Sequence, residues 1–436
     1  MRLDSCIAAG IAGIFMLGSA CFAFARNSAR DEIRLVPERA GGVYLAYPEN
    51  EIDTVAMSVP DGYEPFYVSH YGRHGSRYLI SDRDYSSLID VLRKAADAGA
   101  LSPLGLDVLA RADSVWIEAE GRGGELTPLG TRQHRNIARR LAKAYPSVFS
   151  GDDVRVTAAS TPVMRCAHSM FAFIEGLKES FPQLDIPRES SPRNLYYLNY
   201  HSPESGPYSG EQGPWFQDFK RFRSAKTQPA RLIASLFADQ GYVKEWVDTE
   251  WLMWQLYWLA VDMQNMETGL SFFDLFTNDE LYDLWQVANF NFYACNSSYP
   301  RAKGLHVRNA VNLVSDILAT ADDYVASHHH GATLRFGHDG NIIPLTALLK
   351  LDGCYSDAVD PERLADDYAN YRISPMASNL QMIFFRNKRN ADDVKVQIKL
   401  NEKPIGLPLP DAGRKGLYRW SDLRGYLQKI VDSGKD

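Results

Sequence analysis

The feature that most constrains the fold is a strand, a loop and a helix that follow one another repeatedly. Residues 64–71 are rich in aromatic and β-branched side chains and predict a strand, which a helix over about 82–98 follows. Residues 153–158 and 332–336 predict further strands, and the latter precedes a helix over 343–351. This order favours an α/β fold whose mostly parallel sheet is sandwiched by helices.

Capping residues mark where several of these helices begin. Ser102-Pro103, Thr127-Pro128 and Thr161-Pro162 each place a hydroxyl side chain before a proline, a pair typical of a helix start. These helices are predicted to run to about residues 119, 144 and 180. Residues 380–385 and 394–400 predict the closing strands.

The middle of the chain is different in character. Trp251, Trp254 and Trp258 share one helix face, and this stripe favours a core face over a platform for a sugar or base. Thr277 and Glu280 form a capping box before another helix. Residues 185–326 are therefore predicted to form a helical insertion domain, which divides an α/β core made of residues 30–184 and 327–436.

The N-terminus resembles an export signal. Cys6 to Ala25 is an uncharged run that ends Ala-Phe-Ala, which predicts a signal peptide over 1–25 that is cleaved after Ala25. Two alternatives stay open: a lipid anchor at Cys21, and an uncleaved membrane anchor. All three place the body of the chain outside the cytoplasm, in the periplasm or beyond, and only an anchor would give it a membrane partner.

Composition and motif searches exclude several classes of protein. The formal net charge of −7 gives no basic balance of the kind that nucleic-acid binders have. None of the 5 cysteines is close enough to another for a zinc-type pair. The chain has no P-loop, dinucleotide fingerprint, Gly-x-Ser-x-Gly elbow or His-Glu-x-x-His motif. We therefore expect no metal and no cofactor.

The sharpest chemical feature follows the first predicted strand. Residues 71–77 read Tyr-Gly-Arg-His-Gly-Ser-Arg and place Arg73 and Arg77 on either side of His74. Guanidinium groups suit phosphate oxygens, and two of them would keep the imidazole neutral and nucleophilic. Gly75 would let the backbone approach a ligand closely. The alternative is a solvated basic turn.

Two other strand ends carry matching groups. Arg165 lies in the first turn of a predicted helix, where free backbone N–H groups favour anions. His338 and Asp339 lie in a glycine-flanked turn after residues 332–336, although Asp339 alone could be a helix cap. Ligands bind at the carboxyl ends of strands in such sheets, so the three strand ends together favour a phosphate site.

In this order, these motifs resemble the histidine acid phosphatases, the branch with phytases and multiple inositol polyphosphate phosphatases. Residues 124–130 (Gly-Glu-Leu-Thr-Pro-Leu-Gly) are similar to a segment common in that family, and the resemblance covers nearly all of the mature chain. It implies that His74 attacks phosphorus and forms a phosphohistidine. It also implies that Asp339 protonates the leaving alcohol and then activates water. Phosphate-binding roles would fall to Arg73, Arg77, Arg165 and His338.

The substrate stays open at this stage. The resemblance implies phytate or another inositol polyphosphate, with a broad-specificity or sugar-phosphate phosphatase as the alternative. The late site reads His338-Asp339, whereas the inositol polyphosphate phosphatases often carry His-Ala-Glu. From another class, the chain could be a non-catalytic binding protein for phosphate ligands. A basic run in the insertion is a candidate for contacts to extra substrate phosphates: Lys220, Arg221, Arg223 and Lys226.

Overall fold

An eight-stranded sheet organises the computed structural model, which describes residues 28–52, 58–151 and 153–434. The strand order is β3-β2-β4-β1-β5-β6-β7, and β8 pairs with β6. The strands are β1 (Tyr63–Arg73), β2 (Val154–Ser160), β3 (Arg188–Ser190), β4 (His330–Gly337), β5 (Asn379–Asn387), β6 (Val394–Leu400), β7 (Lys403–Pro404) and β8 (Leu417–Arg419).

The sheet has a parallel half and an antiparallel half. The pairs β2–β3, β2–β4 and β1–β4 are parallel. From β1 onward, β5, β6, β7 and β8 join by antiparallel pairing. The expected α/β class is confirmed, with a mixed sheet. The parallel half is the part that matters for the site, because β1, β2 and β4 all end at the same edge.

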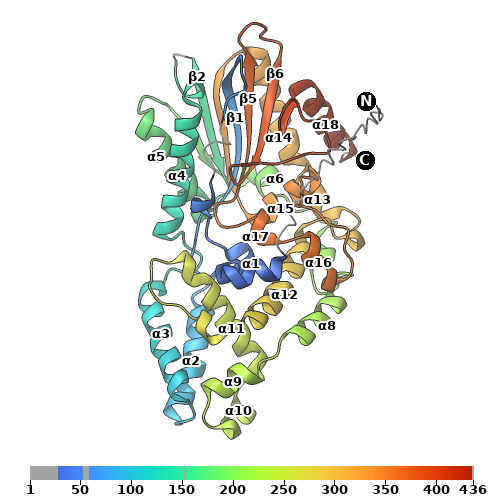
Figure 1. The fold of residues 1–436 in the computed structure, drawn as a ribbon. Coiled ribbons are helices and arrows are strands. Elements are labelled where there is room, and N and C mark those ends of the chain that lie inside the picture. The colour runs from blue at the N-terminus through green and yellow to red at the C-terminus, as the bar shows by residue number, and fades with distance from the viewer. Residues whose placement is uncertain (1–27, 53–57, 152, 435–436) are drawn as a thin grey trace, which may run out of the picture.

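Helices cover both faces of this sheet and form a large lobe at one end of it (Figure 1). The N-terminal and core-side helices are α1 (Ala29–Leu35), α2 (Arg83–Asp97), α3 (Pro103–Ala119), α4 (Pro128–Ala144), α5 (Met164–Ser180), α15 (Asp339–Leu348), α16 (Pro361–Asp367), α17 (Asn370–Ile373) and α18 (Trp420–Ser433). Those between β3 and β4 are α6 (Leu195–Leu198), α7 (Gly206–Ser209), α8 (Phe216–Lys226), α9 (Ala230–Leu236), α10 (Gln240–Trp246), α11 (Thr249–Asp262), α12 (Asn278–Asn296), α13 (Leu305–Arg308) and α14 (Val311–Ser327).

Short 3₁₀ helices join several of these elements. They are η1 (Pro37–Tyr44), η2 (Glu49–Glu51), η4 (Pro146–Val148), η5 (Pro192–Asn194), η6 (Met263–Asn265), η7 (Phe273–Leu275) and η8 (Pro300–Ala302). Of these, η1 packs against α11, α12 and α17. It thereby joins the N-terminal segment to the helical lobe.

Two apolar clusters hold the layers together. On one face of the sheet, α4 and α5 pack against each other and bury Val156, Phe336 and Ile383. On the other face, α14, α15 and α18 cover β1 and β6 in a second cluster, which continues into the helical lobe. In that lobe Trp254 is buried, while Trp251 and Trp258 pack against the same cluster from its edge. The Trp stripe is therefore a core face.

Helix contacts cross the expected domain boundaries. The helices α2 and α3 precede residue 185, yet they pack against α11 and α9 in the lower lobe of Figure 1. Conversely, α14 ends at Ser327 and packs on β1 and α18 beside the sheet. The lobe thus draws on two stretches of sequence, because an amphipathic helix buries its apolar face wherever a complementary face lies.

Most expected element boundaries agree closely with the structure, and the differences lie near strand ends. Ser102 and Thr127 cap α3 and α4 as expected, by accepting hydrogen bonds from Gly105 N and Gly130 N. By contrast, α5 begins at Met164 with no side-chain cap. Helix α15 begins at Asp339 rather than at residue 343. The short strand β3 was not expected.

The expected signal segment lies outside the described residues, as do Cys21 and Ala25. Within the described part, no helix is long and apolar enough to cross a bilayer. Of the cysteines in that part of the chain, Cys166 and Cys295 are free thiols.

Candidate active site

Three neighbouring parallel strands bring the predicted residues to one edge of the sheet. Arg73 is the last residue of β1, and His74 follows it directly. His338 follows β4, which lies between β1 and β2. Arg165 is the second residue of α5, after β2. The sheet therefore converts three distant sequence motifs into one cluster.

The loop that carries His74 is clamped by the start of α4. Thr127 donates two hydrogen bonds to Ser76 O, from its backbone N at 2.9 Å and its hydroxyl at 3.1 Å. The side chain of Gln133 also bonds both the backbone N and the hydroxyl of Ser76. A Cβ at Gly75 would lie 2.5 Å from Gly130 O. The glycine next to His74 thus makes room for the start of α4.

The imidazole of His74 is buried and held as the neutral form. Its Nδ1 lies 2.9 Å from Gly75 O. Because a carbonyl only accepts, Nδ1 carries the proton and the lone pair is on Nε2. Burial lowers the pKa of His74 well below 6.5, and the charges of Arg73, Arg165 and Arg77 lower it further. Burial is therefore the main cause of the neutral ring, and the flanking guanidiniums act in the same direction, as the sequence predicted.

Three guanidinium groups surround His74, each fixed in a different way. Arg73 is fully buried and donates from Nη1 to Ser374 O at 2.8 Å. Arg77 donates to Tyr78 O at 2.7 Å, and its guanidinium lies 4.6 Å from the centre of the Tyr44 ring. The side chain of Arg165 is half-buried at the start of α5, and its Nε has no hydrogen-bond partner among the described residues. This arrangement provides three positive charges around one neutral imidazole.

His338 faces His74 from the end of β4, with ring centres 5.8 Å apart. Thr161 Oγ1 lies 3.1 Å from Nε2 of His338, and the Cys166 sulfur lies 3.5 Å from the same nitrogen. Burial lowers the pKa of His338 to about 4, helped by Arg165. The hydroxyl of Thr161 thus contacts this ring, and the N-cap position of α5 falls to Val163.

Asp339 is the first residue of α15. The cap position belongs to His338, and the Asp339 carboxylate accepts instead from Gly340 N at 2.9 Å. Its other oxygen lies 2.9 Å from Nη2 of Arg73, and the side chain is 25% exposed. Burial raises the pKa of this carboxyl, but Arg73, His338 and Arg77 outweigh burial and hold it below its usual value. The simple helix-cap alternative therefore does not describe Asp339.

Residues that the motifs did not indicate complete the site. Val43 O accepts from Arg73, and the ring of Tyr44 packs on Arg77, so η1 contributes to the pocket. The Tyr71 hydroxyl accepts from His338 N at 3.2 Å. Thr161 could have been found from the sequence, because it is a polar residue at the end of a predicted strand. For Val43 and Tyr44, the sequence holds no such signal, since they lie 30 residues before the loop.

The basic run of the insertion makes contacts elsewhere. It lies on α8, which packs against α12 and α16. Lys226 Nζ lies 3.2 Å from Glu362 and 3.5 Å from Asp283, while Arg223 lies over the ring of Trp254. Arg221 pairs with Asp218, and Lys220 lies 5.3 Å from the centre of the Phe216 ring. None of these contacts involves a predicted residue of the phosphate pocket.

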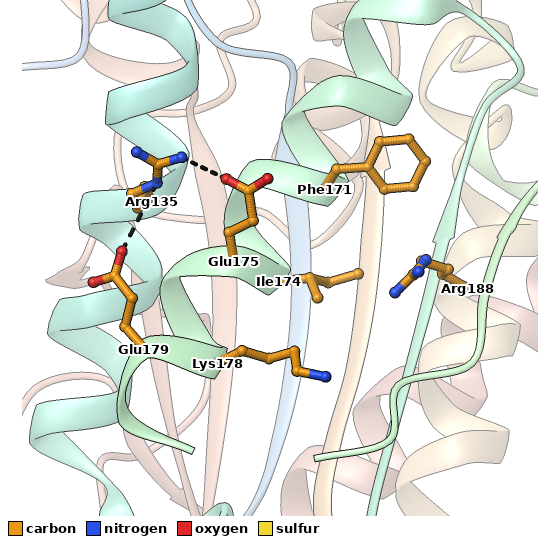
Figure 2. A pocket seen from close by; sticks show the side chains of 7 residues that line it. All are labelled: Arg135, Phe171, Ile174, Glu175, Lys178, Glu179 and Arg188. Atoms are coloured by element: carbon orange, nitrogen blue, oxygen red, sulfur yellow. Dashed lines mark hydrogen bonds and ion pairs between the residues drawn. The ribbon is translucent and has the colours of Figure 1, made fainter. Parts of the chain in front are cut away.

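A cavity of about 820 Å³ lies on α4 and α5, away from the residues around His74 (Figure 2). Its lining side chains are Arg135, Phe171, Ile174, Glu175, Lys178, Glu179 and Arg188. Arg135 forms ion pairs with both Glu175 and Glu179, so much of its charge is already compensated. None of the predicted site residues lines this cavity.

Comparisons with known proteins agree with the geometry. Residues 72–401 match the family model of the histidine phosphatase superfamily (branch 2). The chain is 22% identical over 403 residues to human multiple inositol polyphosphate phosphatase 1, a match that covers 83% of this chain and 78% of that one. The chicken protein of the same name is 24% identical over 421 residues, covering 87% and 84%.

Solved structures show the same fold. A Bifidobacterium longum multiple inositol polyphosphate phosphatase, in complex with inositol hexasulfate, superposes with a TM-score of 0.72 at 19% identity. That match covers 89% of this chain and 97% of the other. A phytase from D. castellii superposes with a TM-score of 0.66 at 16% identity, covering 90% and 85%. With the family model spanning most of its length, the chain belongs to branch 2 of the histidine phosphatase superfamily and is a histidine acid phosphatase.

Proposed function

We propose that this enzyme hydrolyses phosphomonoesters through a phosphohistidine at His74. The observation that carries the proposal is a buried, neutral imidazole whose Nε2 lone pair lies among Arg73, Arg77 and Arg165. In the first step, Nε2 attacks phosphorus, a P–N bond forms and the ester P–O bond breaks. The guanidiniums and His338 hold the phosphoryl oxygens, where negative charge develops in the transition state.

Asp339 would supply the proton that the leaving alcohol needs. In the free enzyme Arg73 holds the carboxyl ionised. A bound phosphoryl group would compete for Arg73 and bring its own negative charge, and both effects raise the pKa of Asp339. After the alcohol leaves, the same carboxylate would take a proton from water, which attacks phosphorus and breaks the P–N bond.

For the substrate, we propose phytate or another inositol polyphosphate. Support comes from the two relatives named multiple inositol polyphosphate phosphatase and from the similar structure that holds inositol hexasulfate. The test measures phosphate release from phytate, glucose 1-phosphate and an aryl phosphate, with a chelator present. We expect kcat/KM for phytate to exceed that for glucose 1-phosphate by about tenfold or more, since extra phosphates add binding energy. Equal values would exclude this substrate class.

A broad-specificity phosphatase is the second candidate, and the position of the basic run favours it. Lys226 and Arg223 are engaged within the protein, so they are not free to meet extra phosphates. Replacing the two exposed members, Lys220 and Arg221, by Gln tests the point. If the run binds substrate, the variant raises the KM for phytate at low salt but not that for an aryl phosphate. Unchanged KM values would assign the run to the solvated surface.

We also propose that the chain is exported. Support comes from the uncharged run from Cys6 to Ala25 and its Ala-Phe-Ala ending. Cell fractionation, with the mass of the mature N-terminus, tests this. A chain that begins at Arg26 supports cleavage, a lipid-modified Cys21 supports an anchor, and an intact chain in the cytoplasm contradicts export.

A further inference from the structure

A second carboxylate lies behind the phosphate pocket, on the side of Arg77. Asp262 is the last residue of α11 in the helical lobe and is fully buried. The proposed mechanism does not use it. A buried carboxylate is costly unless it is paired, hydrogen-bonded or protonated, so its presence there needs an explanation.

The hydrogen bonds to Asp262 come from neutral groups. The Tyr85 hydroxyl on α2 donates to Oδ2 at 2.9 Å, and the Asn265 amide on η6 donates to Oδ1 at 3.3 Å. The compensating cation is Arg77, which attracts the carboxylate electrostatically without forming an ion pair among the described residues. Asp262 is therefore coupled to a predicted phosphate-binding residue through charge and not through a direct bond.

The same network fixes the loop that carries His74. The side-chain oxygen of Asn265 accepts from the Ser76 hydroxyl at 2.7 Å, and its amide donates to Tyr44 O at 2.8 Å. Ser76 lies between Gly75 and Arg77, and Tyr44 packs on the Arg77 guanidinium. Asn265 therefore links Asp262 by hydrogen bonds to Ser76, which precedes Arg77 in the chain, and to Tyr44, whose ring packs on Arg77.

The groups around Asp262 allow it to change charge near neutral pH. Burial raises the pKa of Asp262 to about 7, although Arg77 and the hydrogen bonds from Tyr85 and Asn265 oppose that effect. The titratable groups that face this network are Arg77 after β1, Tyr85 on α2 and Tyr44 on η1, and Asp339 also acts on the charge of Arg77. Burial raises the pKa of Tyr85 far above neutrality, so the phenol stays protonated.

We propose that Asp262 is a positioning residue that acts through Arg77 and makes phosphoryl binding depend on pH. As a carboxylate, it offsets the charge of Arg77 and repels an incoming dianion. As a carboxylic acid, it no longer offsets the charge of Arg77, and the guanidinium attracts the ligand more strongly. The inference rests on Arg77 binding the phosphoryl group, and it is independent of which phosphomonoester is the substrate.

Inorganic sulfate is a suitable probe, because its charge does not change between pH 5.5 and 8.5. Its inhibition constant is measured against hydrolysis of an aryl phosphate across that range. In the free enzyme the pKa of His338 is about 4 and those of His74 and Asp339 are lowered. A bound anion acts on these groups alike in the wild type and in a variant of Asp262, so the comparison between the two proteins isolates Asp262. We expect sulfate to bind the wild type roughly five- to tenfold more weakly at pH 8.5 than at pH 5.5, as for charges coupled inside a protein.

The variant Asp262→Asn should bind sulfate with nearly the same affinity at both pH values, because its side chain stays neutral. The same substitution at exposed Asp90 on α2 is the matched control and should retain the wild-type profile. The proposal would be overturned if Asp262→Asn showed the same dependence of sulfate affinity on pH as the wild type. It would also be overturned if the sulfate affinity of the wild type did not depend on pH.

A second variant covers the case in which Asp262→Asn does not fold. Tyr85→Phe keeps the charge of Asp262 and removes one hydrogen bond that stabilises the carboxylate. The midpoint of the sulfate profile should therefore move to higher pH, by about half a unit or more. An unmoved midpoint would contradict the role of Asp262. Loss of phytate preference in any of these proteins would concern the proposed substrate alone.

Discussion

Two pairs of histidines lie close to the end of β1, and they differ in their surroundings. His74 and His338 lie in the candidate site. There Nδ1 of His74 lies 2.9 Å from Gly75 O, and Nε2 of His338 lies 3.1 Å from Thr161 Oγ1. His70 and His134 lie in the core among Phe173 and Phe336, and neither ring has a side-chain hydrogen-bond partner among the described residues. Burial lowers the pKa of both core histidines to about 3.

The comparison shows that a lowered pKa does not identify a catalytic histidine by itself. All four rings are neutral near pH 7, because burial disfavours the charged form at every one of them. What separates the site pair is a fixed ring orientation and a set of guanidinium neighbours. Orientation presents a defined lone pair, and the guanidiniums attract the phosphoryl group.

The largest expected effect is at the nucleophile. His74→Ala should lower the turnover of an aryl phosphate by roughly 10⁴-fold or more, as removal of a nucleophile does in other hydrolases. His70→Leu, which removes a ring from the core pair, should stay within about threefold of wild type. Acid-quenched wild-type enzyme should carry labelled phosphate on His74. Label on another residue, or comparable losses in both variants, would contradict the distinction between the pairs.

The next effect tests the carboxylate beside the site pair. Asp339→Asn should slow hydrolysis of sugar or inositol phosphates by about 10²–10⁴-fold, since their alcohols need a proton to leave. An aryl phosphate should lose much less, because its phenolate leaves without one. Kinetics on the two classes of substrate measure the difference. Equal losses on the two classes of substrate would show that Asp339 forms an ion pair with Arg73 but does not donate the proton.

The core pair should set the limit of stability in acid. The folded state keeps His70 and His134 neutral, whereas in the unfolded chain they titrate near 6.5. The unfolded state therefore binds more protons below pH 6.5, and stability falls as the pH drops from 6.5 toward about 3, by about 1.4 kcal/mol per unit for each ring.

Chemical denaturation across that range measures the slope. In the double variant His70→Leu with His134→Leu, the stability should depend less on pH over this window than in the wild type, with little change in activity at pH 7. A double variant with the wild-type slope would show that other groups cause the acid sensitivity.

The smallest effect removes one partner from the site pair. Thr161→Val keeps the shape of the side chain but leaves Nε2 of His338 without the hydroxyl, as in the core pair. We expect KM for an aryl phosphate to rise about three- to tenfold, since a hydrogen bond contributes roughly 1 kcal/mol. Thr161→Ser should restore the value. No change in Thr161→Val would mean that packing alone orients His338.

The sequence alone determined which groups are the candidates for the chemistry. The motif at residues 71–77, Arg165 and the His338-Asp339 pair could be read directly, because each lies next to a strand with a clear pattern. The sheet then places them together, as parallel strands end at a common edge. Most strand and helix limits were also predictable, since turn residues, caps and apolar periods act over a few positions.

Only the tertiary structure decided how these groups are held. The Thr161 hydroxyl contacts His338 and does not cap α5, and α15 begins at Asp339, whose carboxylate pairs with Arg73. Likewise, Tyr44 on η1 packs on Arg77, and Asp262 on α11 acts on its charge, although both elements are far from it in sequence. Such contacts depend on the packing of whole helices. Local patterns cannot encode them, because any polar residue of either helix would fit the same pattern.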